Sequence, residues 1–265
     1  MYASRYRHWL FIAKIYAMTS ISASIIAHNE EKNIGACLES LAWVNEIILV
    51  DCESTDKTAE IAARYPVKMF SRPNASNLNI NKQFAIDQCS GEWIIYVDPD
   101  ETIPMELQEE IKALLMKGHS ADAYSIPRKN HYFGRWLRHG GKYPDLQLRL
   151  FRKGTASFPC RDVHEKLTVL GKEALLTNSF AHFPYRDYDD VIKKLDFYAA
   201  LKAEKFIKAD RPAALGPARA FRRFAVSYFL KLGFLDGPEG FAAAVIDMFN
   251  EVLAYLKYRQ ISGNK

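Results

Sequence analysis

Three acidic residues follow a strongly hydrophobic stretch in the segment EWIIYVDPDETIP, residues 92 to 104. The apolar residues before Asp98 are typical of a buried strand, whereas the carboxylates of Asp98, Asp100 and Glu101 are costly to bury without partners. A surface turn would leave them solvated. Two carboxylates separated by one residue also suit an oxygen-ligated Mg²⁺ or Mn²⁺ that carries a diphosphate.

The elements that must position these acids alternate along the first half of the chain. Strands are predicted at residues 21–27, 46–51, 67–71 and 93–97, and helices at 28–41, 54–65, 79–91 and 104–116. Asn29 is expected to cap the first of these helices, and Gly91 to end the third with a positive φ. Strands that alternate with helices of this length predict βαβ units and a parallel sheet.

A parallel sheet places the carboxyl ends of its strands at one edge, where ligands bind. His28 and Glu30 follow the first predicted strand, and Asp51 ends the second. Asp98 and Asp100 follow the fourth, so all these polar groups are expected at the same edge. This convergence favours a ligand site over a solvated surface turn.

Composition limits the class of protein. The chain has 265 residues, of which 49% are hydrophobic and 25% charged, so it can bury a substantial core and is not a disordered chain. Its length suits one large α/β domain with an appendage, or two small domains. The four cysteines show no C-x-x-C spacing, which argues against a zinc site and is typical of reduced thiols in a cytosolic protein.

The first residues imitate a signal peptide, because Arg5 and Arg7 precede an apolar segment. Lys14 interrupts that segment, however, and no convincing small-residue cleavage site follows it. We therefore expect residues 1–20 to be a loosely attached extension, or sequence upstream of a start at Met18. No apolar run reaches the length of a transmembrane helix.

Four segments resemble the family 2 glycosyltransferases, which are inverting enzymes of the GT-A fold. The segments are SIIAHNEEKNIGACLESL, EIILVDCESTDKTAEIA, NKQFAIDQCSGEWIIYVDPDE and RDVHEKL, and they occur in consistent order between Ile21 and Phe183. Near the C-terminus, YFLKLGFLDGPEGF resembles the lipopolysaccharide core glucosyltransferases that extend the inner-core heptose.

The resemblance implies a fold class and three regions. An α/β GT-A domain, a Rossmann-like nucleotide-binding sheet with helices on both faces, is expected at residues 21–185. The extension at 1–20 precedes it, and a helical, basic, membrane-proximal region follows at 186–265. The implied reaction moves a hexose, glucose, from UDP-glucose to a lipopolysaccharide inner-core sugar or a similar glycolipid. The implied cofactor is Mg²⁺ or Mn²⁺, bound at a DXD motif.

The resemblance also assigns roles around the donor base. Ala27, His28 and Glu30 would border the uracil pocket, and Asp51 would accept the uracil N3–H, as an acceptor-only carboxylate can. The alternative for His28 is a strand-end histidine that only bonds backbone, and for Asp51 an acid that caps a helix.

The remaining donor roles fall on the ribose and the diphosphate. Asp98 would meet the ribose hydroxyls, and Asp100 would ligate the metal between the two phosphates. Pro99 stands where the family usually has a small residue, which keeps the spacing and stiffens the loop. Lys82 would contact the diphosphate or anchor the strand-end acids, unless it is a solvated lysine.

The second half of the chain must supply a base and an acceptor site. An inverting transfer needs one base near the acceptor hydroxyl and a metal for the leaving diphosphate. The resemblance places the catalytic carboxylate at Glu165, and His164 would orient it or be the base instead. The residues expected to bind a sugar-phosphate acceptor are basic or aromatic: Arg135, Trp136, Arg138 and Arg161. The alternative is that half of these side chains belong to a core or hinge.

Beyond residue 185 the hydrophobic period becomes helical. One apolar stripe consists of Ile192, Leu195, Ala199, Ala203 and Phe206, and a second of Phe221, Phe224, Ala225, Tyr228 and Leu232. Residues 202–231 hold eight Lys and Arg against two acids, a local +6 in a chain of net charge +5.

This combination of aromatic stripes and positive charge suits an anionic membrane surface. We therefore expect a cytoplasmic protein that is peripheral at the inner face of the cytoplasmic membrane. A helical cap packed on the first domain is the alternative for the stripes. Nucleic acid is not expected as a partner, because no nucleic-acid module is recognised and the charge lies outside the acidic site.

Other classes of protein remain as alternatives. A sugar-phosphate nucleotidyltransferase also joins a nucleotide-binding fold to acidic metal ligands, but the segment AHNEEKN lacks the expected Gly-rich phosphate loop. A lectin-like or scaffolding protein would not need Asp51, Asp98, Asp100 and Glu165 together. Within family 2, a polyprenyl-phosphate or protein acceptor is the further alternative.

Overall fold

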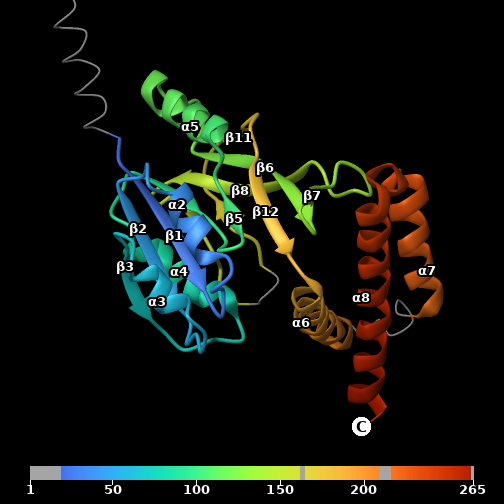
Figure 1. Cartoon of the computed structure of the whole chain (residues 1–265). Helices are drawn as coiled ribbons and strands as arrows, with labels where there is room; N and C mark the ends of the chain where they lie inside the picture. The colour runs from blue at the N-terminus through green and yellow to red at the C-terminus, as the bar shows by residue number, and fades with distance from the viewer. Residues whose placement is uncertain (1–18, 162–164, 209–215, 264–265) are drawn as a thin grey trace, which may run out of the picture. The chain divides into compact units, whose positions relative to one another are not determined.

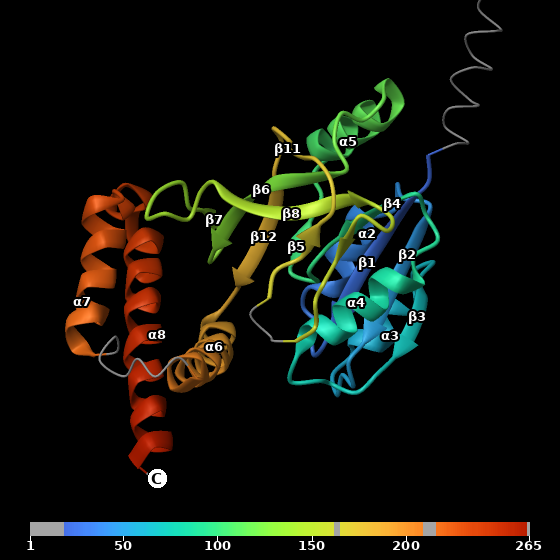
Figure 2. The same cartoon turned by 180° about the vertical axis from the view of Figure 1, so that it is seen from behind.

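Residues 19–161, 165–208 and 216–263 are described by the structure, a computed structural model. They fall into two units, which are treated separately below. Residues up to 128, together with 146–181, form the first unit, and residues 129–145, together with those from 182 onward, form the second. Strands and helices alternate in the first, whereas the second is mostly helical (Figures 1 and 2).

Parallel strands begin the first unit. Strand β1 (Ile21–Ala27) pairs with β2 (Glu46–Asp51) and with β4 (Trp93–Tyr96), and β2 also pairs with β3 (Lys68–Ser71). The register sets Ala27 opposite Asp51, so these strands end at the same edge. The parallel sheet and its strand positions confirm the prediction from the sequence.

Side chains alternate between the two faces of this sheet because successive strand residues point in opposite directions. One buried cluster takes alternate strand residues such as Ala23, Ile25 and Leu49 and packs them against helices α2 (Ile34–Ser40), α3 (Thr58–Ala62) and α5 (Met105–Lys117). The other cluster takes the opposite set, such as Ile48 and Val50, and packs it against α4 (Leu78–Gln88). Helices therefore cover both faces, as expected of the GT-A fold.

The sheet continues beyond β4 through β8 (Asp145–Arg152), which is antiparallel to β4. The strands that follow in order across the sheet are β6 (Ala123–Tyr132), β12 (Phe180–Tyr185) and β5 (Glu101–Thr102). Two short strands pair with β6, namely β7 (Arg135–Trp136) and β11 (Glu173–Leu175), and β9 (Ala156–Ser157) pairs with β10 (Thr168–Val169). Arg149 on β8 is thereby brought beside the strand that carries the acidic motif.

Two turns differ from the sequence prediction. Asn29 does not cap α2: it takes a left-handed conformation, with φ of 55°, and its Oδ1 accepts from the backbone N–H of Thr55 at 2.8 Å. The N-cap position of α2 is Asn33 instead. Gly91 does not have a positive φ, but a Cβ there would lie 2.7 Å from the backbone nitrogen of Ser22, so close packing against β1 requires the glycine.

The second unit packs its helices around a separate core. The helical elements are α6 (Tyr188–Lys208), α7 (Pro217–Ala225), the π-helical turn η2 (Val226–Leu230), the 3₁₀ turn η3 (Gly233–Asp236) and α8 (Gly237–Gly263). Its core joins Tyr132, Leu137 and Tyr185 to residues of α6 and α8 such as Leu195 and Ile246. The C-terminal helical region expected from the sequence is therefore present.

The boundary between the units differs from the expected domain ranges. Residues 129–145 were assigned by sequence to the domain at 21–185, but they group with the C-terminal helices. One ion pair and one hydrogen bond explain this: Lys142 Nζ lies 2.9 Å from Asp247 on α8, and His139 Nδ1 lies 2.9 Å from Asp236 on η3. The extension at 1–20 lies almost wholly outside the described residues.

The helical stripes also need correction. On α6, Leu195 is buried as expected, but Ile192 is exposed and Val191 is buried in its place. The stripe drawn from Phe221 to Leu232 is not one helical face, because α7 ends at Ala225, η2 widens the turn and Leu232 is left-handed. Both Phe221 and Leu232, at the two ends of the predicted stripe, are exposed. None of the helices in the described ranges is long and apolar enough to cross a membrane.

Candidate active site

The edge where β1 and β2 end gathers the first group of expected site residues. Cys52 donates its backbone N–H to the carbonyl of Ala27 at 2.8 Å, and its own carbonyl accepts from His28 Nδ1 at 2.6 Å. The ring of His28 is thus held by backbone at the strand end, with Nε2 near Asn29 Nδ2 at 3.2 Å. Glu30 is tied to the turn through Asn33, whose Nδ2 donates to Glu30 Oε2 at 2.7 Å.

Asp51 has two differently placed carboxylate oxygens. The side chain is buried at the end of β2, and Oδ2 accepts from the backbone N–H of Ser54 at 3.3 Å. Its Oδ1 is buried and has no hydrogen-bond partner within the described residues. A buried acceptor without a partner is costly, so this oxygen is suited to receive an N–H from a ligand.

Asp98 meets positive charge directly after β4. Its Oδ2 accepts from Nη2 of Arg149 on β8, and its Oδ1 accepts from the phenol of Tyr96. Lys82 on α4 adds its ammonium group 3.9 Å from Oδ1. Of the two roles predicted for Lys82, the structure thus shows a contact with a strand-end acid.

These contacts control the ionisation of the group. Burial raises the pKa of Asp98, but the charges of Arg149 and Lys82, with the hydrogen bonds from Tyr96 and Arg149, outweigh it and hold the pKa well below its usual value. Burial and the nearby Asp98 carboxylate raise the pKa of Tyr96 well above normal, so the phenol stays a donor. Asp98 is therefore an ionised, oriented carboxylate at neutral pH.

Glu101 is fully buried and forms the second half of this network. Its Oε1 accepts from Arg149 Nη2 at 2.7 Å and from Nη1 of Arg128, on β6, at 3.0 Å. Its Oε2 accepts from the backbone N–H of Asp98 at 3.0 Å, which ties the turn to the network. Arginines from neighbouring strands, rather than solvent, therefore neutralise two of the three acids in the opening segment.

Asp100 is the third acid, and it is buried in the turn between β4 and β5. No group of three or more His, Cys, Asp or Glu side chains suited to a metal occurs among the described residues. Mg²⁺ commonly takes one or two carboxylates and completes its shell with water and substrate phosphates. Asp100 would supply one such carboxylate, and Asp98 and Glu101 are bonded to arginine.

Helix α4 links the acidic turn to Glu165. The side chain of Asn79, which is buried, donates to the backbone carbonyl of Glu165 at 3.1 Å. Lys82 lies one turn further along α4, on the same face, and contacts Asp98. Glu165 Oε2 also accepts from the backbone N–H of Arg161 at 2.7 Å. The backbone of Glu165 is thus bonded to helix α4, the same helix whose Lys82 contacts Asp98.

Of the two candidate bases, Glu165 is described by the structure, and His164 lies outside the described residues. Glu165 itself is not in a strand. Among the expected acceptor residues of the first unit, Arg161 is exposed on the same loop.

Of the expected acceptor residues in the second unit, Arg138 lies beside Trp136, together with Lys129 and Tyr143, which the sequence did not single out. The guanidinium of Arg138 lies 4.4 Å and the ammonium of Lys129 lies 4.8 Å from the ring centroid of Trp136. Tyr143 meets the same ring edge-on at 5.3 Å. Arg135 is engaged elsewhere, 3.4 Å from Glu239. The two cations are attracted electrostatically by the face of the indole ring.

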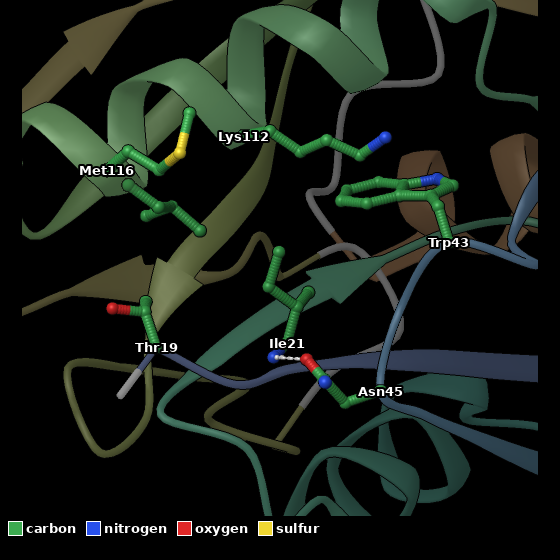
Figure 3. A pocket seen from close by; sticks show the side chains of 7 residues that line it. Thr19, Ile21, Trp43, Asn45, Lys112 and Met116 are labelled. Atoms are coloured by element: carbon green, nitrogen blue, oxygen red, sulfur yellow. Dashed lines mark hydrogen bonds between the residues drawn. The ribbon is translucent and has the colours of Figure 1, made fainter. Parts of the chain in front are cut away.

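A hollow at the opposite end of β1 is unrelated to this chemistry. Figure 3 shows its lining between the start of β1 and α5, where Lys112 lies over the ring of Trp43 and Ile21 N–H donates to Asn45 Oδ1 at 2.8 Å. It lies at the amino end of β1, whereas Asp51 and Asp98 gather at the carboxyl end. Ligands of such sheets bind at the carboxyl ends.

Several contacts of the site were missed from the sequence. In the sequence, Arg149 and Arg128 look like ordinary residues of basic strands. Asn79 is one of several asparagines near a helix start and does not stand out. One signal was present in the segment DLQLRLFR, where residues two apart point to the same face of a strand. Arg149 therefore shares a face with Phe151, and a buried arginine was predictable once that face was known to be buried.

Comparison with known proteins decides the family. The model of glycosyl transferase family 2 matches residues 22–169. The chain belongs to this family. The lipopolysaccharide core biosynthesis glycosyltransferase LpsC of Rhizobium meliloti is 30% identical over 253 residues, which cover 91% of each chain. The uncharacterised glycosyltransferase RT0209 of Rickettsia typhi is 28% identical over 265 residues, covering 92% of this chain and 88% of its own.

The fold of this glycosyltransferase also has a solved counterpart. Residues 1–349 of Staphylococcus aureus TarS, in a crystal structure with UDP, match with a TM-score of 0.50 and 17% identity, covering 92% of this chain and 90% of that one. The match supports the GT-A fold that the sequence predicted, with a mixed α/β sheet and C-terminal helices. It shows the fold alone, and the donor is argued separately below.

Proposed function

We propose that this family 2 enzyme transfers a hexose, glucose, from a UDP-sugar to a lipopolysaccharide inner-core sugar or a similar glycolipid. The observation that carries the donor half is the buried, partnerless Oδ1 of Asp51 at the strand-end edge. LpsC, a relative over most of both chains, supports the acceptor half by its role in lipopolysaccharide core biosynthesis. The UDP in the TarS structure supports the donor nucleotide.

The donor nucleotide is assigned to the edge of the parallel strands. Asp51 Oδ1 accepts the uracil N3–H, and Ala27, His28 and Glu30 border the base from the end of β1. Asp98 receives the ribose hydroxyls, since its carboxylate is held ionised by Arg149. Lys82 on α4, whose ammonium group lies 3.9 Å from Asp98 Oδ1, contacts the diphosphate.

A divalent cation, Mg²⁺ or Mn²⁺, is proposed at Asp100, shared with the diphosphate. When bound, it would neutralise the charge that develops on the departing UDP. The chain's own contribution is to hold Asp100 in a buried turn beside a network in which Asp98 and Glu101 are already balanced by arginine.

Glu165 is proposed as the base that removes the proton from the attacking acceptor hydroxyl. The anchoring of its loop by Asn79 supports this, because α4 also reaches Asp98. His164 is the alternative base or an orienting group. Trp136, Arg138 and Arg135 are proposed as acceptor-binding residues of the second unit, and Arg161 is proposed separately as an acceptor-binding residue of the first.

The cellular place proposed is the inner face of the cytoplasmic membrane, as a peripheral protein. Two of the arginines that suggested this are paired within the second unit: Arg219 lies 3.0 Å from Glu251, and Arg223 lies 3.7 Å from Asp247. The local excess of positive charge is therefore partly neutralised by α8, and membrane binding needs a different argument.

The test is release of UDP from a panel of UDP-sugars, with and without a lipopolysaccharide inner-core acceptor. Wild-type protein should release UDP from UDP-glucose in a reaction that EDTA stops and Mg²⁺ or Mn²⁺ restores. Asp51→Asn should weaken UDP binding, and Asp100→Asn should lower turnover by about 10²-fold or more because it removes the charged metal ligand.

Asp56→Asn is a matched control, since Asp56 also lies after β2 but its Oδ1 accepts from the backbone N–H of Thr58, the first residue of α3, at 2.9 Å. It should leave UDP release nearly intact. Full activity in EDTA would overturn the metal assignment, and release of pyrophosphate in place of UDP would indicate a nucleotidyltransferase.

A further inference from the structure

The turn that joins α7 to α8 exposes an unusual amount of apolar surface. Phe229 is 56% exposed, Leu230 76% and Leu235 52%. Leu232 and Phe234, in the same turn, are also exposed. Together we call residues 229–235, with Phe241, the apolar tip. In Figures 1 and 2 the helices α7 and α8 lie side by side, and the tip lies where they meet.

Aromatic rings of the apolar tip pack against Tyr228. The ring of Tyr228 contacts those of Phe229, Phe234 and Phe241 at centroid distances of 5.1, 6.2 and 5.6 Å. Phe224 adds a further contact to Phe229 at 6.2 Å. Scattered exposed apolar side chains are normal, but a group of this kind marks an interaction site.

Backbone geometry holds the tip in place. The π turn is followed by Leu232 in a left-handed conformation, with φ of 57°. Gly140 donates its backbone N–H to the carbonyl of Lys231 at 2.8 Å, and Ser227 Oγ donates to the carbonyl of Gly140 at 3.1 Å. Positive φ at a leucine is strained, and it persists here because these contacts over-determine the turn. The exposed side chains are therefore presented by a fixed scaffold.

Charge around the tip is positive. Both acids of residues 217–241 are engaged: Asp236 binds His139, and Glu239 lies 3.4 Å from Arg135. Arg222 and Lys231 are exposed and form no ion pair with any described residue. Lys231 lies within the apolar tip itself, between Leu230 and Leu232.

We propose that the apolar tip inserts into the boundary between headgroups and acyl chains of an anionic bilayer. This rests on, and gives a contact surface to, the proposed action on a glycolipid at a membrane. Apolar residues supply burial in the interface, and Lys231 and Arg222 meet anionic headgroups. A second copy of this chain is a poorer occupant, since a two-fold contact would bring the same positively charged patch of both copies together.

The experiment measures co-sedimentation with phosphatidylcholine vesicles, with and without phosphatidylglycerol. The double variant Leu230→Ser, Leu235→Ser should bind the anionic vesicles about tenfold or more weakly. Leu256→Ser, at a similarly exposed leucine of α8, is the matched control and should bind like wild type. Lys231→Gln should weaken binding by about fivefold, and Arg259→Gln, on α8, by much less.

Two further measurements keep the outcome clear. The double variant should bind UDP normally and unfold at the wild-type temperature, since the removed side chains are exposed. Unchanged vesicle binding by the double variant would overturn the proposal, as would loss of a dimer in analytical ultracentrifugation without loss of vesicle binding. If the wild type releases no UDP from UDP-sugars yet binds vesicles through the apolar tip, the proposed function is wrong, whereas the proposal that the tip binds membranes is supported.

Discussion

Both units bury acids against basic residues, but they do so for different ends. In the first, Arg149 joins Asp98 and Glu101 across neighbouring strands, and the guanidinium is almost wholly buried at the edge where ligands bind. In the second unit, Glu251 on α8 forms ion pairs with Lys202 of α6 and Arg219 of α7. The strand network fixes two acids at the carboxyl edge of the parallel strands, whereas the helix network ties three helices together.

The comparison teaches that a run of charge in the sequence does not give the charge of a surface. The segment with the largest excess of Lys and Arg is partly neutralised by acids that lie more than twenty residues later in the chain. The segment with the densest acids is neutralised by arginines from other strands. Only the charged side chains that these ion pairs leave unpaired are available to a binding partner.

The largest expected effect separates chemistry from folding in the first unit. Glu165→Gln keeps the shape of the side chain but cannot accept a proton, so kcat should fall by about 10² to 10⁴. UDP-sugar affinity should barely change, because Asp51 and Asp98 remain. Steady-state kinetics and UDP titration of both Glu165→Gln and His164→Ala check this. An inactive His164→Ala beside a nearly normal Glu165→Gln would assign the base to the histidine.

The next effect is on stability and tests the strand network. Arg149→Met leaves two carboxylates facing each other in a buried site, so the free energy of unfolding should fall by about 3–5 kcal/mol. Urea denaturation measures it. Arg152→Gln, on the same strand, breaks an exposed pair with Glu92 and should cost about 1 kcal/mol or less. Equal losses at the two positions would show that the buried pairs contribute nothing special.

A smaller loss is expected from the helix network. Glu251→Gln removes the charge that Lys202 and Arg219 share, and the free energy of unfolding should fall by about 2 kcal/mol. Burial lowers the pKa of Lys202, and Glu251 opposes that shift, so the variant should lower the pKa of Lys202 further. Asp196→Asn, which breaks the exposed pair with Lys257 at 2.8 Å, is the control and should have little effect.

The smallest effect is a pH dependence confined to the strand network. The pKa of Asp98 in the folded protein is held below its unfolded value of about 3.9. The stabilisation that the ionised Asp98 gives to the folded state is therefore fully present above that pH. Below it, the unfolded chain takes up the proton first and the stabilisation is lost as pH falls through the folded pKa. The difference in Tm between wild type and Asp98→Asn should therefore shrink from pH 7 to below pH 4. A difference that stays constant over that range would argue against the ionised pair.

Much of the first unit was predictable because local signals agreed with each other. Runs of β-branched and apolar residues placed β1, β2 and β4, and the rule that parallel strands share a ligand edge placed Asp51 with Asp98 and Asp100. The caps were less predictable, since Asn29 bonds the neighbouring loop at Thr55 and no signal within its own segment indicates that.

The sequence by itself determined the family, the parallel sheet and the acids at its edge, because these depend on short periodic patterns and on spacing within single segments. Tertiary structure alone decided what neutralises those acids, since Arg149 is some fifty residues from Asp98 in the chain and meets it only through strand pairing. It also decided which side of the C-terminal helices is exposed. A π turn and one left-handed leucine rotate the apolar face, and helical periodicity cannot register a break of that kind.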